Sequence, residues 1–240
     1  MTQSMRCITT LALAAGMAAS AGAADFFSTE KCDNWLTFGA RIGVNTSNRT
    51  VSKDLITPYS RQSWGTGFNV GITADLNFRD YLSIQPGVFF ESRSGDYTFQ
   101  QELADGQRGV YSVMQAGHRR SYNLTVPVLA SFRFNITDDV RWSVDFGPYV
   151  SFVLDSSHKN KALLSNGDQG MFTPPFMPET KDVDFGFKMG TGLTILNHYY
   201  VGVHYEAGVL DAYKDVKIDG YKLIYGGRTK AWLFTLGYNF

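Results

Sequence analysis

The chain ends with Lys230-Ala-Trp-Leu-Phe-Thr-Leu-Gly-Tyr-Asn-Phe240, and this stretch decides the fold. Every second position holds a large apolar residue: Trp232, Phe234, Leu236, Tyr238 and Phe240. Because side chains alternate between the two faces of a strand, this spacing predicts a β-strand with one continuous apolar face. Lys230 has the parity of that apolar face, so we place it in the preceding loop.

Seven further segments alternate between apolar and polar residues in the same way. They are residues 35–45, 67–78, 81–92, 121–134, 141–152, 182–195 and 199–209. Their apolar faces carry no charged residue, and the charges of these segments fall on the opposite face. A basic residue that faces lipid costs about 2–4 kcal/mol at the bilayer midplane, so this pattern suits a membrane barrel.

Short and long connections alternate between the predicted strands. The short ones are rich in turn formers (79–80, 135–140 and 197–198), and the long ones are polar (46–66, 93–120, 154–181 and 210–229). Outer-membrane barrels have short periplasmic turns and longer extracellular loops. The sequence therefore predicts an all-β fold, an eight-stranded antiparallel up-and-down transmembrane β-barrel with four long extracellular loops. Closure would place the last strand beside residues 35–45.

Aromatic residues gather at both ends of the predicted strands. Near the short turns are Phe78, Phe134, Trp142, Tyr238 and Phe240, and near the long loops are Phe90, Tyr122, Phe152, Phe185, Tyr205 and Trp232. Aromatic rings favour the two water–lipid interfaces. A soluble barrel or sandwich could bury the same rings, since alternation does not say which face points outward. The charged second face and the loop asymmetry favour the membrane.

The second face of the strands alternates glycine with large polar groups. We expect a polar network in the lumen, formed by Arg41, Asp75, Glu91, Arg133, Asp145, Asp184, Lys188, His204 and Glu206. Eight strands leave an interior that side chains can just fill, and buried charges must be paired. This predicts an interlocked plug, with a selective channel for small solutes as the alternative.

The first residues are typical of a secretory signal peptide. A positive charge at Arg6 precedes an apolar run and a small-residue cleavage region, and the run is too short to span a membrane. We assign residues 1–23 to the signal peptide, 24–34 to a short periplasmic segment and 35–240 to the barrel. Cys7 would be removed with the signal, so Cys32 is left without an internal disulfide partner.

Composition excludes some partners and chemistries. With 22 basic and 22 acidic residues the chain has no nucleic-acid footprint. His118 and His158 lie in predicted loops, His198 in a turn and His204 on the inward face. Spacing assembles no Ser-His-Asp or His-Asp grouping from them, and no His/Cys cluster suits a metal. We therefore expect no enzyme, no catalytic residue, no metal and no cofactor.

Five segments resemble a known family in the order in which they occur. They are Leu82-Ser-Ile-Gln-Pro-Gly-Val88, Leu124-Thr-Val-Pro-Val-Leu129, Phe146-Gly-Pro-Tyr149, Asp184-Phe-Gly-Phe-Lys-Met-Gly-Thr-Gly192 and Tyr205-Glu-Ala-Gly-Val209. This order is similar to the PorT-like, porin-family outer-membrane barrels of Bacteroidetes, which have the size of OmpA and OmpX barrels. Pro86, Pro127 and Pro148 are awkward inside strands, and we expect bulges or kinks there.

The resemblance extends to the chain end and implies partners. A last strand that finishes on Phe resembles the sorting signal of outer-membrane barrels, which implies that Trp232, Phe234, Leu236, Tyr238 and Phe240 serve insertion. Expected partners are outer-membrane lipid, the barrel-assembly machinery with its periplasmic chaperones, and an extracellular ligand at the loops. We expect an integral outer-membrane protein with a structural or surface-binding role. The alternatives are a narrow channel, an accessory part of a protein secretion system, and a surface lipid-modifying enzyme.

Overall fold

A computed structural model describes residues 26–32, 34–50, 59–105, 109–164, 169–170, 180–212, 214, 216–218, 221–223 and 227–240. Eight long strands form a barrel: β1 (Leu36–Arg49), β2 (Tyr59–Arg79), β3 (Leu82–Asp105), β4 (Gly109–Thr137), β5 (Val140–Leu164), β7 (Val183–Ile195), β8 (Tyr199–Gly208) and β11 (Thr229–Asn239). Three short strands lie outside it: β6 (Gln169–Gly170), β9 (Val216–Ile218) and β10 (Tyr221–Leu223). No helix in the described part of the chain is long and apolar enough to cross a membrane.

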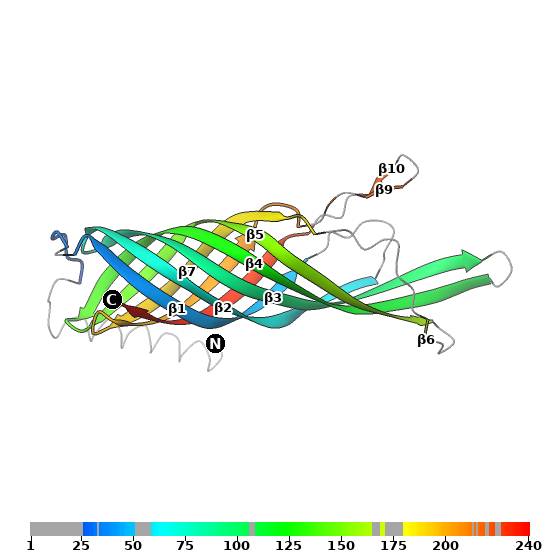
Figure 1. The fold of residues 1–240 in the computed structure, drawn as a ribbon, viewed down its shortest axis with the longest axis horizontal. Coiled ribbons are helices and arrows are strands. Elements are labelled where there is room, and N and C mark those ends of the chain that lie inside the picture. The colour runs from blue at the N-terminus through cyan, green and yellow to red at the C-terminus, as the bar shows by residue number, and fades with distance from the viewer. Residues whose placement is uncertain are drawn as a thin grey trace, which may run out of the picture.

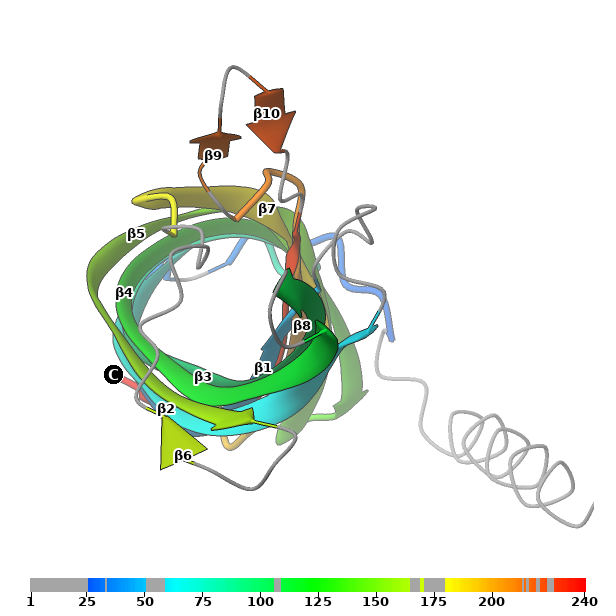
Figure 2. The same ribbon diagram turned by 90° about the vertical axis from the view of Figure 1, so that its right-hand side faces the viewer.

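The sheet closes on itself in antiparallel pairs. The order runs β4-β3-β2-β1-β11-β8-β7-β5, and β5 pairs again with β4. Closure joins the first and last strands, with Gly39 opposite Asn239 and Arg49 opposite Thr229. The predicted eight-stranded up-and-down barrel and its closing pair are therefore confirmed, and Figure 2 shows the ring seen along its axis.

Alternation assigns one face of each strand to the outside and the other to the lumen. On β1, Phe38 and Ile42 are exposed while Arg41 and Asn45 are buried. A barrel that buried its apolar face would show the opposite pattern. The outward face of the described strands is thus a continuous apolar band, which is what lipid contact requires.

Lys230 is an exception to the expected placement. It lies inside β11, opposite Asn48 of β1 and Ala207 of β8, and its side chain is on the outward face. The prediction that it belongs to a loop is wrong, because both neighbouring strands extend far enough to pair with it. Lys230 is next on that face to Trp232, whose ring lies 4.8 Å from that of Tyr205. At this strand end a lysine can reach its amine into water along its flexible stem.

Much of what the sequence assigned to long loops is paired strand. β3 and β4 continue through residues 93–120 and pair as far as Asp105 and Gly109. β5 runs on to Leu164, although its pairing with β7 ends at Phe152 opposite Val183. We call the part beyond the barrel the extension: residues 59–64 of β2, 95–105 of β3, 109–119 of β4 and 156–164 of β5. Figure 1 shows it projecting from one end of the barrel.

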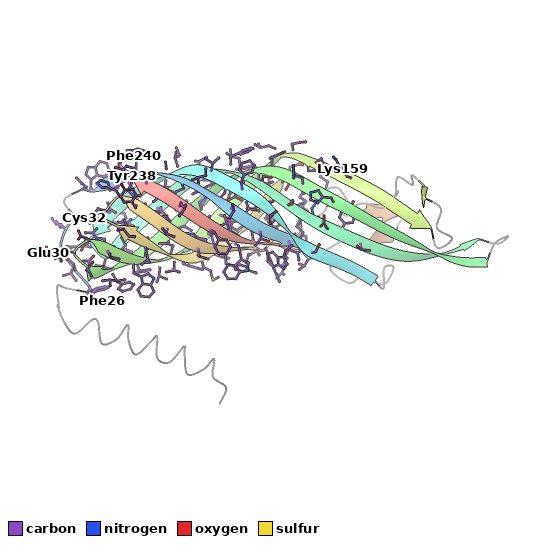
Figure 3. The ribbon with its side chains drawn as sticks, turned by 90° about the horizontal axis from the view of Figure 1, so that it is seen from below. Phe26, Glu30, Cys32, Lys159, Tyr238 and Phe240 are labelled. Carbon is purple, nitrogen blue, oxygen red and sulfur yellow. The ribbon has the colours of Figure 1, made fainter. Side chains whose placement is uncertain are left out.

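The other end of the barrel holds the tight turns. Leu196 and Asn197 adopt positive φ values of 53° and 62° between β7 and β8, a conformation that residues other than glycine seldom take. Residues 26–32 lie along this end, where the Asn135 amide donates to the Phe26 carbonyl (3.1 Å) and the Asp80 amide to that of Glu30 (3.1 Å). Phe26, Cys32, Tyr238 and Phe240 all lie there in Figure 3, far from Lys159. The predicted signal peptide falls outside the described residues.

The prolines do not produce bulges. Pro86 stands opposite Val128, and the same β3–β4 register resumes at Phe89 opposite Thr125. The register shifts lie elsewhere, between Trp64 and Asn69, Asn77 and Arg79, Tyr122 and Asn123, and Asn135 and Thr137. The predicted bulges at prolines are therefore wrong. A proline removes one donor from the ladder, and here the strands skip pairs without changing register.

Candidate functional site

The barrel interior contains a cluster of charges near the extension end, which we call the outer cluster: Glu91, Arg93, Asp184, Lys188 and Glu206. Arg93 is its centre. Its Nη2 lies 2.6 Å from Glu91 Oε2 and 2.6 Å from Glu206 Oε2, and its Nη1 lies 3.8 Å from Asp184 Oδ2. Lys188 Nζ lies 3.1 Å from Glu206 Oε1. These side chains come from β3, β7 and β8, so the cluster ties opposite walls of the barrel together.

A second group of charges lies nearer the turns, and we call it the inner cluster: Arg41, Asp75, Arg133, Asp145 and His204. Arg133 Nη2 lies 2.7 Å from Asp75 Oδ2, and His204 Nε2 lies 3.1 Å from Asp145 Oδ2. Arg41 donates to Asn239 Oδ1 (2.7 Å) instead, and its guanidinium lies 4.4 Å from the centre of the Tyr200 ring. Neutral side chains also donate hydrogen bonds to these carboxylates: Gln85 donates to Asp75, and Ser131 donates to Asp145.

The nine charged or histidine residues named from the sequence for the lumen all point inward, and they fall into these two clusters. Sequence reasoning missed Arg93, because the predicted strand ended one residue earlier. The signal was present, since Arg93 is two residues after Glu91 and so on the same face. It also missed two aromatic residues that point into the lumen, Tyr149 and Tyr200, which are 1% and 6% exposed.

Glycines make room for these aromatic rings. Tyr200 contacts Gly192 on β7 and Gly202 on its own strand so closely that a methyl group at either position would collide with the ring. The glycine–polar alternation of the inward face thus serves packing, because several large inward side chains, among them Arg41, His204 and Tyr200, lie over positions without a Cβ.

A cavity of about 20 Å³ lies between the two clusters. Its lining includes Lys188 of the outer cluster and Arg41 and His204 of the inner one. A water molecule needs about 10–15 Å³ of such space, so this cavity has room for one. Phe89, whose ring lies 4.9 Å from Lys188 Nζ, also lines it.

The extension carries a polar pair on an exposed surface. Asp96 on β3 and His118 on β4 face each other, with Asp96 Oδ1 2.6 Å from His118 Nδ1, and their side chains are 64% and 43% exposed. On the other face Tyr97 is buried and covers Gly117, its partner across the ladder. An aromatic ring over a cross-strand glycine is a device that pins register.

Two histidines form His–Asp pairs that spacing did not predict, since His204 contacts Asp145 (3.1 Å) and His118 contacts Asp96 (2.6 Å), but no Ser-His-Asp triad forms among the described residues. Asp145 contacts both Ser131 and His204, so the serine bonds the carboxylate and not the imidazole. A Ser-His-Asp triad needs the serine hydroxyl on the histidine, and no such bond is found in the described part of the chain. His198 lies in a turn with its ring stacked on Tyr238 at 5.3 Å, and the side chain of His158 lies outside the described residues. No group of three His, Cys, Asp or Glu in the described ranges could hold a metal ion.

The large apolar residues of the last strand lie on the lipid-facing side. All five are exposed: Trp232, Phe234, Leu236, Tyr238 and Phe240. The Phe240 amide donates to the Phe38 carbonyl of β1 (2.8 Å), and its ring meets that of Tyr238 edge-on at 5.5 Å. The chain end is thus fixed to the first strand by its backbone while its ring remains on the surface.

Comparison with known proteins identifies the family. Similar solved structures include Ail, the attachment invasion locus protein of Yersinia pestis, in complex with the heparin analogue sucrose octasulfate (14% identity, 86% of this chain and 100% of that chain, TM-score 0.38). Others are the outer membrane protein OprG from Pseudomonas aeruginosa (11%, 89% and 99%, TM-score 0.41) and the outer membrane enzyme PagL (14%, 82% and 97%, TM-score 0.36). No curated protein matches significantly. A family model described as "Outer membrane protein beta-barrel domain" matches residues 24–214, and the chain therefore belongs to this family of outer-membrane β-barrels.

Proposed function

We propose that this protein is a closed outer-membrane barrel that holds the extension at the cell surface as a platform for binding an extracellular protein. The observation that carries the proposal is the extension itself. From Gly95 to Asp105, β3 spans roughly 35 Å at the usual rise of a strand. A barrel that only sealed a membrane would need none of this length.

The lumen supports an anchor better than a channel. Arg93 reaches across to Glu206, and the buried rings of Tyr149 and Tyr200 fill the space on either side. Breaking such buried pairs is costly, so they resist the opening that conduction requires. We therefore rank the narrow solute channel second.

The extension offers an edge for strand addition. Past Phe152, β5 is paired with β4 on one side. Within the described residues its other side bonds only at Val153, whose amide donates to the Asp182 carbonyl (2.8 Å), and at Ala162 and Leu163, which pair with the two-residue β6. Unpaired backbone groups on an edge strand are a template for another strand. The ligand class that fits is an extended peptide segment, held by main-chain hydrogen bonds.

A selection experiment tests the platform. A displayed library of random peptides would be panned against the refolded full chain and against a variant in which residues 96–117 are replaced by a tight two-residue turn. We expect peptides that bind the full chain and not the shortened variant. Both proteins must first show the heat-dependent gel mobility of a folded barrel. Enrichment of the same peptides on both proteins, or of none on either, would contradict the proposal.

Conductance separates the anchor from the channel. The refolded protein in a planar bilayer should show no discrete single-channel steps. Regular steps that change in size when Arg93→Met is introduced would favour the channel instead, because Arg93 bridges the lumen at the outer cluster.

We also propose that the last strand is an insertion signal. Deleting Phe240 removes one backbone hydrogen bond and a ring that is 74% exposed, so the folded barrel should be almost unchanged. Assembly in cells should fall several-fold, measured as the amount of heat-modifiable protein in outer-membrane fractions. A matched deletion of the Tyr59 to Arg61 segment would control for shortening. Normal levels of the Phe240 deletion would count against the sorting role.

We also propose that the protein belongs to the PorT-like subfamily of these barrels. The PorT-like subfamily rests on the five sequence segments, and the matched family is broader than that. We propose no secretion role and no lipid-modifying activity, since no residue marks the first and, among the described residues, no serine hydroxyl bonds a histidine as the second would need.

A further inference from the structure

Residues 26–30, which we call the rim segment, lie against the turn end of the barrel. Figure 3 shows Phe26 and Glu30 at that end. The backbone of the segment is held at both of its ends, since the Asn135 amide donates to the Phe26 carbonyl (3.1 Å) and the Asp80 amide to the Glu30 carbonyl (3.1 Å). The segment thus runs along the barrel rim from the turn between β2 and β3 to the end of β4.

The rim segment covers a sheet edge that β3 leaves open. The β3–β4 ladder ends at Phe132, whereas β4 continues toward the turns in its pairing with β5. Past that point the Arg133 amide donates to the Tyr81 carbonyl (2.8 Å), and the Asn135 amide, two residues on, donates to the Phe26 carbonyl. An uncovered strand edge is costly where water is scarce, so the segment supplies what this edge needs beside lipid.

The two phenylalanines of the rim segment join the aromatic residues on the outside of the barrel. Phe26 stacks on Phe134, with ring centres 5.2 Å apart, and the Phe27 ring lies 4.4 Å from that of Tyr81 and 6.2 Å from that of Phe134. Phe134 has the outward parity of β4, and its ring lies 5.3 Å from that of Trp142 on β5. Because Phe26 takes the place of a β3 residue beside β4, its ring stands next to Phe134 on the lipid-facing side.

Nearly half of each added ring is still open. Phe26 is 47% exposed and Phe27 48%, and this open surface continues the lipid-facing band through Phe134. The next residues of the chain, Glu30 and Lys31, are charged and exposed. Aromatic rings followed by charges are expected where a chain passes from the membrane interface into water. The occupant that fits the open rings is therefore phospholipid at the headgroup boundary.

We propose that the rim segment is a membrane anchor, in which the rings of Phe26 and Phe27 insert among the phospholipids of the periplasmic leaflet. The sequence alone assigns residues 24–34 to the periplasm, whereas this proposal places the first part of them in the bilayer interface. The contact is apolar, so it requires no particular headgroup charge. It is independent of the surface platform, because the extension lies at the opposite end of the barrel.

Site-specific photocrosslinking in intact cells tests the contact. The photoreactive amino acid p-benzoylphenylalanine is introduced in place of Phe26, of Lys31 as the water-facing control, or of Phe38, which is exposed on the outward face of β1, as the lipid-facing reference. Each variant must first show the heat-dependent gel mobility of a folded barrel. We expect phospholipid adducts, identified by mass spectrometry, to be as abundant at position 26 as at position 38 and about tenfold rarer at position 31.

The adducts decide between the possible occupants. Equal yields of phospholipid at positions 26 and 31 would overturn the proposal, because both positions would then share one environment. A clear yield at position 38 with none at position 26 would overturn it as well. A cross-link from position 26 to another protein would show a periplasmic partner in place of lipid, and a cross-link to Phe134 alone would show a ring that only packs on the barrel.

Hydrogen exchange in lipid vesicles supplies a second readout. The Asn135 amide is bonded to the Phe26 carbonyl, so it exchanges when the rim segment leaves the barrel. Replacing both rings, by Phe26→Ser with Phe27→Ser, should raise this exchange rate about tenfold or more, since the segment opens locally without its anchor. Phe26→Trp should keep the slow rate, because tryptophan also favours the interface, and Lys31→Ser should not change it. The same rate in the wild type and the double serine variant would contradict the anchor.

Discussion

The barrel interior and the extension are built from the same strands, but their charged residues lie in opposite environments. Inside the barrel, β3 places Glu91 and Arg93 where both are at most 4% exposed, and their contacts run across the lumen to β8. A few residues later on the same strand, Asp96 meets His118 on a surface open to water. Charge therefore holds the barrel closed in one region and is free to meet a partner in the other.

The largest expected effect comes from breaking the interior. Arg93→Met leaves Glu91 and Glu206 without the guanidinium that joins them, and loss of one partner of a buried ion pair costs about 3–5 kcal/mol. We expect this loss in urea unfolding followed by tryptophan fluorescence in lipid vesicles. Arg120→Met on the exposed side of β4 is the matched control and should stay within about 0.5 kcal/mol. If both variants lost the same stability, the buried charges would be no more important to the fold than the exposed ones.

The comparison also explains which features the sequence could predict. The barrel strands follow one parity rule, so their number, their lipid-facing residues and the pairing of β11 with β1 could all be read from alternation. In the extension the large apolar residues Tyr97, Phe99 and Leu103 change to the odd positions of β3. A prediction that requires apolar residues at the even positions ends this strand at residue 92. Arg93 is then assigned to a loop.

The contacts across the lumen could not be predicted for a different reason. Alternation says that Glu91 and Glu206 face inward, but not that they meet at one nitrogen of Arg93. That requires the stagger of the strands, which depends on register shifts such as those at Trp64 and Tyr122. A shift of one residue changes which side chains share a level of the barrel.

A smaller loss of stability is expected when a charge is added to the outer surface of the barrel, and almost none when it is added to the extension. Phe234 lies half-exposed in the middle of β11, opposite Val44 and Val203. Phe234→Lys puts a charge into lipid and should cost about 2–4 kcal/mol. Ser157→Glu adds a charge on the exposed face of β5, opposite Arg120, and should change stability by less than about 0.5 kcal/mol. The same vesicle unfolding measurement reads both, and a tolerated lysine at 234 would contradict a lipid-facing position there.

The smallest effect belongs to the exposed pair on the extension. Asp96 and His118 are close, at 2.6 Å, yet both side chains are largely open to water. The contact is an ion pair only when His118 is protonated, and exposed ion pairs contribute about 0–1 kcal/mol. A double-mutant cycle with Asp96→Asn and His118→Ala should give a coupling in that range, and added salt should reduce it, because exposed charges are screened. The corresponding cycle on Lys188 and Glu206 inside the barrel should give a larger coupling with little salt dependence. If the surface pair proved as strongly coupled as the buried one, the extension would be held rigid by its charges, and Asp96 and His118 would not be available to a ligand.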